Sequence, residues 1–167
     1  MNIKWVVLDD DPTGVQTVHD IAVYTDWTKE TFLTALQAEE DLLGLMKELN
    51  AELKVTALQQ QRSVAAPGTR IFIAENDEKH IVGCATLCVF ESPTWRKASV
   101  EDVVVLPAYR GQGIGRTLLQ RIIDFAKNKL APIDLRLTSN PTRTEANALY
   151  QALGFEKRDT NVYMMKL

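Results

Sequence analysis

A glycine-rich turn in the second half of the chain has the composition of an anion-binding site. The turn spans Arg110–Arg116, has the sequence RGQGIGR, and follows the apolar, β-branched run Val103–Leu106. Apolar residues at helical spacing come directly after it. Where a strand leads through a glycine turn into a helix, backbone N–H groups converge at the positive end of the helix dipole. Because glycine lets the backbone approach a ligand closely, the turn predicts a loop that binds phosphate or pyrophosphate.

Three phosphate-binding patterns compete for this turn. The dinucleotide pattern G-x-G-x-x-G fails because Arg116 stands where its third glycine is required. The P-loop pattern needs a Gly-Lys-Ser/Thr ending, which the sequence lacks. The remaining pattern, Arg-x-x-Gly-x-Gly, is matched by Arg110, Gly113 and Gly115. That pattern is short, so a glycine-rich helix start without a ligand is the alternative.

Two carboxylates and one phenol are candidates for moving protons. Glu101 and Asp102 precede the valine run, and Tyr150 lies in a predicted helix. On a regular strand Glu101 and Val103 share a face, whereas Asp102 points to the opposite face. A carboxylate can accept a proton, and a phenol with a pKa of about 10 can donate one at neutral pH. The structural alternatives are a carboxylate paired with a basic neighbour and a tyrosine packed in the core.

Two cysteines lie close together in an apolar, strand-like stretch. Cys84 and Cys88 are four residues apart, a spacing that puts both on one face of a strand. A redox pair or an acyl-carrying nucleophile is one interpretation, but it needs an activated thiolate, and the sequence offers no activator. We favour two small buried apolar side chains. No histidine is near enough in sequence to indicate a zinc site, and we expect no metal.

The order of predicted elements indicates an α+β fold with a mixed, mostly antiparallel sheet and helices on both faces. Alternation and apolar runs predict strands at residues 3–8, 21–25, 31–37, 70–75, 81–91, 96–106, 133–138, 155–158 and 162–167. Helical spacing predicts helices at residues 39–50, 55–65 and 144–153, and another from the glycine turn to Ala131-Pro132. Gly154 is expected to close the last helix.

Length and composition fit one globular domain with an appendage. The chain has 167 residues, of which 46% are hydrophobic and 25% charged, enough to build a real core. A formal net charge of −3 argues against a general nucleic-acid partner. The N-terminal apolar run is too short for a signal-peptide core or a membrane helix. We therefore expect a cytoplasmic protein with reduced thiols and no membrane partner.

Two separated motifs resemble one superfamily. The stretch Val100–Gly115 resembles the fourth strand and acetyl-CoA loop of the GCN5-related N-acetyltransferase (GNAT) superfamily. Asn147–Phe155, with the sequence NALYQALGF, is similar to that family's final helix and following strand. The likeness covers about residues 31–167 and concerns the fold and the cosubstrate, not the acceptor. It implies an acetyl-CoA-dependent N-acetyltransferase domain there, with residues 1–30 as an N-terminal extension, either flexible or strand-loop-strand.

The resemblance implies roles for individual residues. Glu101 would accept the proton of the amine, with Asp102 as the second choice, and Tyr150 would protonate the departing thiolate. The N–H of Val103 would bind the thioester oxygen, and Arg143 could reach a phosphate. The residues implied in binding acetyl-CoA are Val103, Val104, Val105, Arg110, Gly111, Gln112, Gly113, Ile114, Gly115, Arg116, Asn140 and Asn147.

The function predicted from this resemblance is acetyl transfer to a primary amine of a small molecule, by direct attack in a ternary complex. The alternatives are a protein or peptide amine as acceptor, and a non-catalytic acyl-CoA sensor or scaffold. The segments expected to build the acceptor site, residues 42–70 and 92–97, carry no signature. The resemblance also allows a homodimer.

Three consecutive aspartates, Asp9–Asp11, lie outside the acetyltransferase likeness. Residues 3–20 resemble the opening strand and acidic loop of the four-carbon acid sugar kinases, which are far longer proteins. Because the rest of such a kinase is absent, we expect a solvated loop that takes no part in the chemistry.

Overall fold

The computed structural model describes residues 4–8, 29–52 and 66–165, together with residues 54, 56, 59, 62 and 63. Its strands are β1 (Lys4–Leu8), β2 (Thr69–Glu75), β3 (Ile81–Glu91), β4 (Arg96–Val105) and β5 (Asp134–Leu137). Its helices are α1 (Lys29–Leu49), α3 (Ile114–Phe125) and α4 (Thr144–Ala152), with a 3₁₀ turn η1 (Pro107–Tyr109) before α3 and a π-helical turn η2 (Ala126–Leu130) after it. The predicted strand at 21–25, the three aspartates and much of the predicted helix at 55–65 lie outside the described residues.

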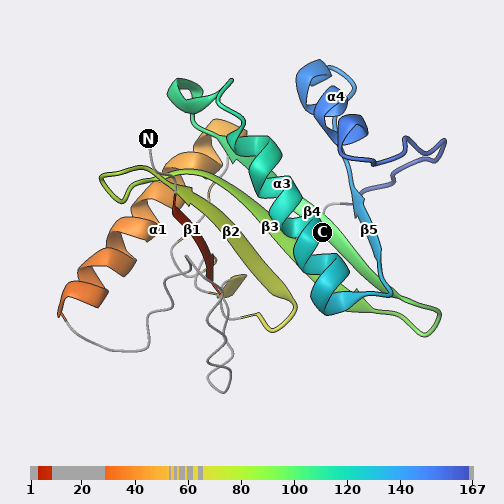
Figure 1. Cartoon of the computed structure of the whole chain (residues 1–167), viewed down its shortest axis with the longest axis horizontal. Helices are drawn as coiled ribbons and strands as arrows, with labels where there is room; N and C mark the ends of the chain where they lie inside the picture. The colour runs from red at the N-terminus through yellow and green to blue at the C-terminus, as the bar shows by residue number, and fades with distance from the viewer. Residues whose placement is uncertain are drawn as a thin grey trace.

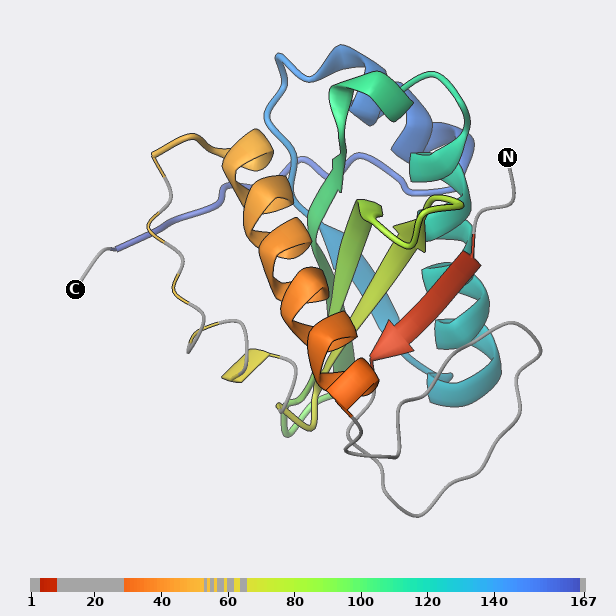
Figure 2. The same cartoon turned by 90° about the vertical axis from the view of Figure 1, so that its left-hand side faces the viewer.

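The strands form one five-stranded sheet in the order β1-β2-β3-β4-β5 (Figure 1). Neighbours are antiparallel from β1 to β4, whereas β5 is parallel to β4. α1 covers one face of the sheet and α3 the other (Figure 2). The predicted mixed, mostly antiparallel α+β fold is therefore confirmed.

The helix α1 packs one face of the sheet through a leucine stripe. Leu42 and Leu45 are buried against Ile71, Ile73 and Val104. The amphipathic helix predicted at 39–50 is present, but it begins ten residues earlier, at Lys29. The predicted strand at 31–37 is therefore wrong. Its weak alternation includes alanine, leucine and glutamine, which are strong helix formers, and the segment continues directly into the leucine stripe.

The helix α3 packs the opposite face of the sheet. Leu118, Leu119 and Ile122 are fully buried, at the three- and four-residue spacing of one helix face, and meet Leu87 and Val100 of the sheet. Burying each of these side chains contributes about 1.5–3 kcal/mol. This core fixes the start of α3, and with it the glycine turn, against β3 and β4.

A bulge in β4 changes which side chains share a face. The β3–β4 register shifts between Cys84 and Thr86, and Asp102 has a φ of 51°. Val100 and Val103 both pack in the α3-side core, whereas Val104 packs on the α1 side. The prediction that Glu101 and Val103 share a face is therefore wrong, because the extra residue at the bulge shifts the alternation by one.

The C-terminal segment departs from the sequence prediction. α4 ends as expected before Gly154, whose φ is +92°. Residues 155–165 contain no strand, so the strands predicted at 155–158 and, as far as the described residues reach, at 162–167 are wrong. A strand needs a partner for its backbone hydrogen bonds, and this described segment has none. Val162–Met165 are left exposed.

Candidate active site

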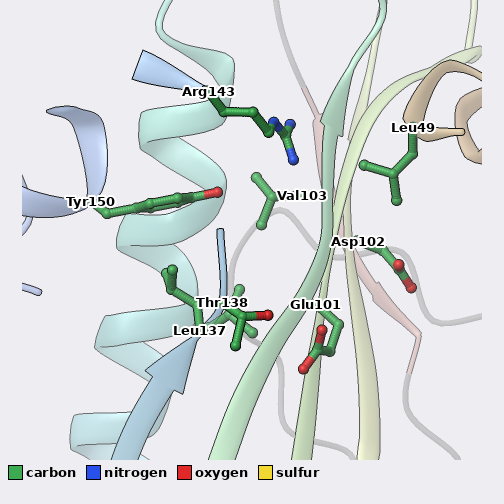
Figure 3. Close-up of a pocket in the computed structure, with 9 residues that line it drawn as sticks. Leu49, Glu101, Asp102, Val103, Leu137, Thr138, Arg143 and Tyr150 are labelled. Atoms are coloured by element: carbon green, nitrogen blue, oxygen red, sulfur yellow. The ribbon is translucent and has the colours of Figure 1, made fainter. Parts of the chain in front are cut away.

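The strands β4 and β5 separate at the middle of β4 and leave a pocket between them. They pair from Lys97↔Asp134 to Val100↔Leu137, and no described residue of β5 pairs with the rest of β4. A pocket of ≈ 180 Å³ lies where they part. It is lined by Leu49, Val100, Glu101, Asp102, Val103, Leu137, Thr138, Arg143 and Tyr150 (Figure 3). The pocket is thus bordered by the two strands, by Leu49 at the end of α1 and by Tyr150 of α4.

The bulge distributes the pocket's functional groups over two sides of β4. Val103 and the hydroxyl of Tyr150 point toward each other, with Arg143 beside them (Figure 3). Asp102 points to the other side, toward Leu49 at the end of α1. The pocket therefore joins a side with a phenol and a guanidinium to a side with carboxylates.

Glu101 and Asp102, hereafter the carboxylate pair, differ in their surroundings. The hydroxyl of Ser99 donates a hydrogen bond to Oε1 of Glu101. Loss of solvent around Asp102 raises the pKa of its carboxyl above 3.8, and the charge of Glu101 raises it further. Among the described residues neither carboxylate forms an ion pair. Asp102 is thus the member of the pair whose proton affinity is increased.

Tyr150 is anchored in the core with its hydroxyl at the pocket. The residue is only 6% exposed, and its ring packs edge-on against Phe155 at a centroid distance of 6.3 Å. Burial raises the pKa of the phenol, and the charge of Arg143 partly opposes that shift. The phenol is therefore protonated at neutral pH. Within the described chain its hydroxyl has no hydrogen-bond partner, so it can donate to a ligand.

The glycine turn has the backbone geometry of an anion cradle. Gly111 and Gly113 have φ values of 75° and 79°, which side chains rarely adopt. Gly113 is the N-cap of α3, where no side chain caps the helix and the first turn contains no acidic residue. The N–H groups of that first turn are therefore open to an anion. The prediction that a helix follows from the glycine turn is confirmed, and the helix begins at Ile114.

Arg110, the first residue of the predicted Arg-x-x-Gly-x-Gly motif, links the glycine turn to β4 and to α1. Arg110 donates from Nε to the carbonyl of Val105 at 3.0 Å. Its Nη2 lies 3.6 Å from Oε2 of Glu48 on α1. Gln112 donates to the carbonyl of Ala108, and Arg116 is exposed on the first turn of α3. The side chains of Arg110 and Gln112 are therefore engaged within the protein, whereas the N–H groups at the start of α3 are open.

Asn140 and Asn147 hold the connection between β5 and α4. Oδ1 of Asn140 accepts hydrogen bonds from the N–H and hydroxyl of Thr142. Nδ2 of Asn147 donates to the carbonyls of Asn140 and Arg143, at 2.9 Å each. These bonds position Arg143 and the start of α4. Contact of either asparagine with a ligand remains a prediction.

Sequence reasoning missed several lining residues. Leu49 lies in the segment 42–70 that is expected to build the acceptor site, but no signature singles it out. Leu137 and Thr138 are predicted only as the end of a strand, and Arg143 only as a contact to a phosphate. The structure brings all four to the pocket. The signal for Leu49 was the position of the helix end, which is set by tertiary packing. No local motif marks it.

The cysteines behave as packing residues. Burial, followed by the charge of Asp102, raises the pKa of Cys84 to about 12. Burial also raises the pKa of Cys88. A thiol with such a pKa carries almost no thiolate at neutral pH, which argues against a covalent route through Cys84. The described residues contain no cluster of three or more metal-ligating side chains and no helix able to span a membrane.

Comparisons with known proteins agree with this arrangement. Residues 67–157, more than half of the chain, match the acetyltransferase (GNAT) domain family. The N-alpha-acetyltransferase RimI of Mycobacterium tuberculosis is 41% identical over 58 residues, which cover 35% of this chain and 34% of that relative. This chain spans at most half the length of the curated relatives it matches.

Solved structures share the fold. One from Agrobacterium tumefaciens, described as an acetyltransferase, has 27% identity and a TM-score of 0.67 over 76% of this chain and 92% of that chain. AAC(6')-Iy, solved in complex with the bisubstrate analogue CoA-S-monomethyl-acetylneamine, has 23% identity and a TM-score of 0.64 over 77% of this chain and 91% of that chain.

Proposed function

This chain belongs to the acetyltransferase (GNAT) domain family, and from that membership we propose that it transfers an acetyl group from acetyl-CoA to a primary amine of a small molecule, by direct attack in a ternary complex. One observation carries the proposal. The pocket between β4 and β5 brings a carboxylate pair and the buried Tyr150 together, and the glycine turn follows on the same run of chain.

The residues present fit acetyl-CoA. The uncapped start of α3 and the positive φ of Gly111 and Gly113 suit a pyrophosphate held by the backbone of residues 110–116. Val103–Val105, on the part of β4 that β5 leaves unpaired, would lie along the acetyl and pantetheine portions. When bound, acetyl-CoA supplies the acetyl group as a reactive thioester. Asn140 and Asn147 are proposed contacts to the pantetheine arm.

The carboxylate pair would accept the proton that the acceptor must lose. An alkylammonium has a pKa of about 10 and no lone pair with which to attack a carbonyl. The sequence places Glu101 first as base and Asp102 second. The bulge removes the shared-face argument for Glu101, and the raised pKa of Asp102 favours Asp102 for the proton.

Tyr150 and Val103 would act on the other side of β4. Transfer forms a bond between the amine nitrogen and the carbonyl carbon and breaks the bond from that carbon to sulfur. The N–H of Val103 would donate to the carbonyl oxygen as it gains negative charge. The ammonium loses two protons in all. The carboxylate accepts one before the attack, the Tyr150 hydroxyl would donate its own proton to the departing sulfur, and the second proton of the nitrogen, released after the attack, restores Tyr150 by way of solvent.

The test compares two tyrosines in a thiol-release assay over a panel of amines. Tyr150→Phe should lower turnover about 100-fold, because it removes one proton donor. Binding of CoA, measured by calorimetry, should be retained. Tyr163→Phe is the matched control, since Tyr163 is 89% exposed in the C-terminal segment. Equal turnover in the two variants would remove Tyr150 from the mechanism.

A second candidate acceptor is the α-amine of a protein or peptide, which the N-alpha-acetyltransferase relative favours. Assaying peptides alongside small amines of equal concentration separates the two. Tight CoA binding without turnover on any amine would instead support the sensor or scaffold alternative.

We further propose that the transferase domain spans residues 31–167 and that residues 1–30 are an extension whose kinase-like acidic loop takes no part in the chemistry. In support, β1 lies at the edge of the sheet opposite to β5, away from the pocket (Figure 1). A cytoplasmic location and a homodimer remain predictions.

A further inference from the structure

The charge of the pocket is divided unevenly between its two sides. Arg143 lies on the side of Tyr150, and its charge acts on the Tyr150 phenol (Figure 3). The influences on Asp102, by contrast, are loss of solvent and the charge of Glu101, both of which disfavour its ionised form. The pocket is therefore positive where acetyl-CoA is proposed to bind and negative on the side of Leu49.

No protein cation balances the carboxylate pair within the part of the chain that is described. Neither carboxylate has an ion-pair partner within 4.0 Å. Arg110, on the turn that follows β4, is paired with Glu48 and does not line the pocket. The C-terminal end of α1, at Leu49, adds the negative end of a helix dipole to this side of the pocket. Lys47 in the last turn of α1 is exposed and does not line the pocket.

The side of the pocket opposite the carboxylates carries a hydroxyl that can bind a ligand. The Tyr150 side chain is more than nine-tenths buried, its hydroxyl is aimed into the pocket, and no described residue accepts its proton. Glu101 and Asp102 are themselves exposed, but they line the same pocket as this hydroxyl, so their negative charge borders a space that a ligand can enter. Two adjacent negative charges repel one another, and a bound ligand can relieve that repulsion.

Building on the proposed function, we propose that the acceptor is a dication, a primary amine that carries a second cationic nitrogen. An acceptor with one ammonium group balances one member of the carboxylate pair, and the second cationic nitrogen balances the other. When the reacting ammonium gives its proton to Asp102, the second nitrogen remains paired with Glu101. Glu101 is thus a specificity residue that selects the acceptor by charge.

The first experiment varies the charge of the acceptor at constant chain length. The substrates are 1,5-diaminopentane, 1-aminopentane and 5-aminopentanoate, assayed by thiol release with acetyl-CoA. kcat/KM should be about tenfold higher for the diamine than for the monoamine, and lowest for the amino acid. The preference should shrink as sodium chloride is raised, because salt screens it. Equal values for diamine and monoamine overturn the inference.

Two matched variants then locate the preference. Glu101→Gln should reduce the ratio of kcat/KM for diamine over monoamine to about twofold or less, since one ion pair is lost. The ratio is informative because loss of a proton acceptor would lower kcat/KM for the diamine and for the monoamine by the same factor. Glu91→Gln removes an equal charge at an exposed position paired with Arg96, outside the pocket, and should keep the ratio. An unchanged ratio in Glu101→Gln overturns the assignment of Glu101.

A probe that cannot be acetylated separates this inference from the proposed function. Binding of 1,5-bis(trimethylammonium)pentane and of pentyltrimethylammonium to the CoA-loaded wild-type protein is compared by calorimetry. Tighter binding of the dication supports the charge selection even if no amine is turned over, whereas equal binding overturns it. Failure of the protein to bind CoA, or to release thiol with any amine, overturns the proposed function. In that case the comparison of the dication with the monocation is repeated without CoA, and it still decides whether the pocket selects ligands by charge.

Discussion

The glycine turn and the carboxylate pair are separated only by residues 103–109 of one run of chain, but they offer different parts of the chain to a ligand. The turn, residues 110–116, presents backbone N–H groups. Its side chains are absent, exposed, hydrogen-bonded within the protein or, for Ile114, buried in the core. The carboxylate pair presents side chains whose directions depend on the bulge at Asp102. A site built from backbone tolerates changes of side chain, whereas one built from a bulge depends on each side chain and on the register that places it.

The largest effect should come from the carboxylate pair. Asp102→Asn should lower kcat/KM about 100-fold, because asparagine cannot accept the proton. Asparagine also tolerates a positive φ, so the bulge should persist. In the wild type, log kcat/KM should rise with pH through the pKa of Asp102, which lies above 3.8, and this acid limb should disappear in the variant.

Glu101→Gln is the comparison for that experiment. With a diamine substrate it should lose less activity than Asp102→Asn and keep the acid limb. If the acid limb vanishes in Glu101→Gln and persists in Asp102→Asn, the roles of the two carboxylates are reversed, and the preference drawn from burial is wrong.

A smaller loss is expected from altering the backbone of the turn. Gly113→Val puts a β-branched residue at a φ of 79° and should weaken CoA binding about tenfold or more, as the strained cap opens. Gly44→Ala is the control, because Gly44 lies in the middle of α1 with nothing within 4 Å of an added Cβ. Calorimetry with CoA measures both variants. Equal CoA affinity of the two variants would mean that the pyrophosphate of CoA binds elsewhere.

The same contrast explains what the sequence could predict. The glycine turn and the start of α3 were predictable, because positive φ and an uncapped helix start are local properties of Gly113 and its neighbours. The bulge at Asp102 was not predictable from the sequence. An aspartate at a positive φ leaves no sequence pattern, and the shift of the β3–β4 register depends on the pairing of β4 with β3. The terminal strands were overpredicted for a related reason. Residues 155–165 carry strand-like residues, but a strand forms only where an edge pairs with it.

A further test measures how the Asp102 carboxylate, at the bulge, affects the stability of the folded protein at different pH values. Because the folded pKa of Asp102 is raised, its ionisation disfavours the folded state as pH rises through that pKa, and the penalty is absent below the unfolded value of 3.8. Asp102→Asn should therefore raise the melting temperature at pH 7. The gain in the free energy of unfolding should be less than about 1 kcal/mol, because Asp102 has lost only part of its solvent and its charge is still screened. The gain should vanish near pH 3. Asp159→Asn, at an exposed position of the C-terminal segment, is the matched control. A variant less stable than wild type at pH 7 would mean that the carboxylate has a stabilising partner.

The smallest effect concerns the link between the two regions. Glu48 on α1 meets Arg110 of the turn at 3.6 Å, with side chains 41% and 56% exposed, so their coupling in a double-mutant cycle of urea unfolding should be only about 0.3 kcal/mol. Arg110→Gln should cost more than Glu48→Gln, because Arg110 also donates to the carbonyl of Val105 at the end of β4. CoA affinity should be unchanged in Glu48→Gln if the turn holds its ligand by backbone alone. A coupling above about 1 kcal/mol, together with weaker CoA binding, would instead mean that α1 helps to set the turn, and the two regions would then act as one unit.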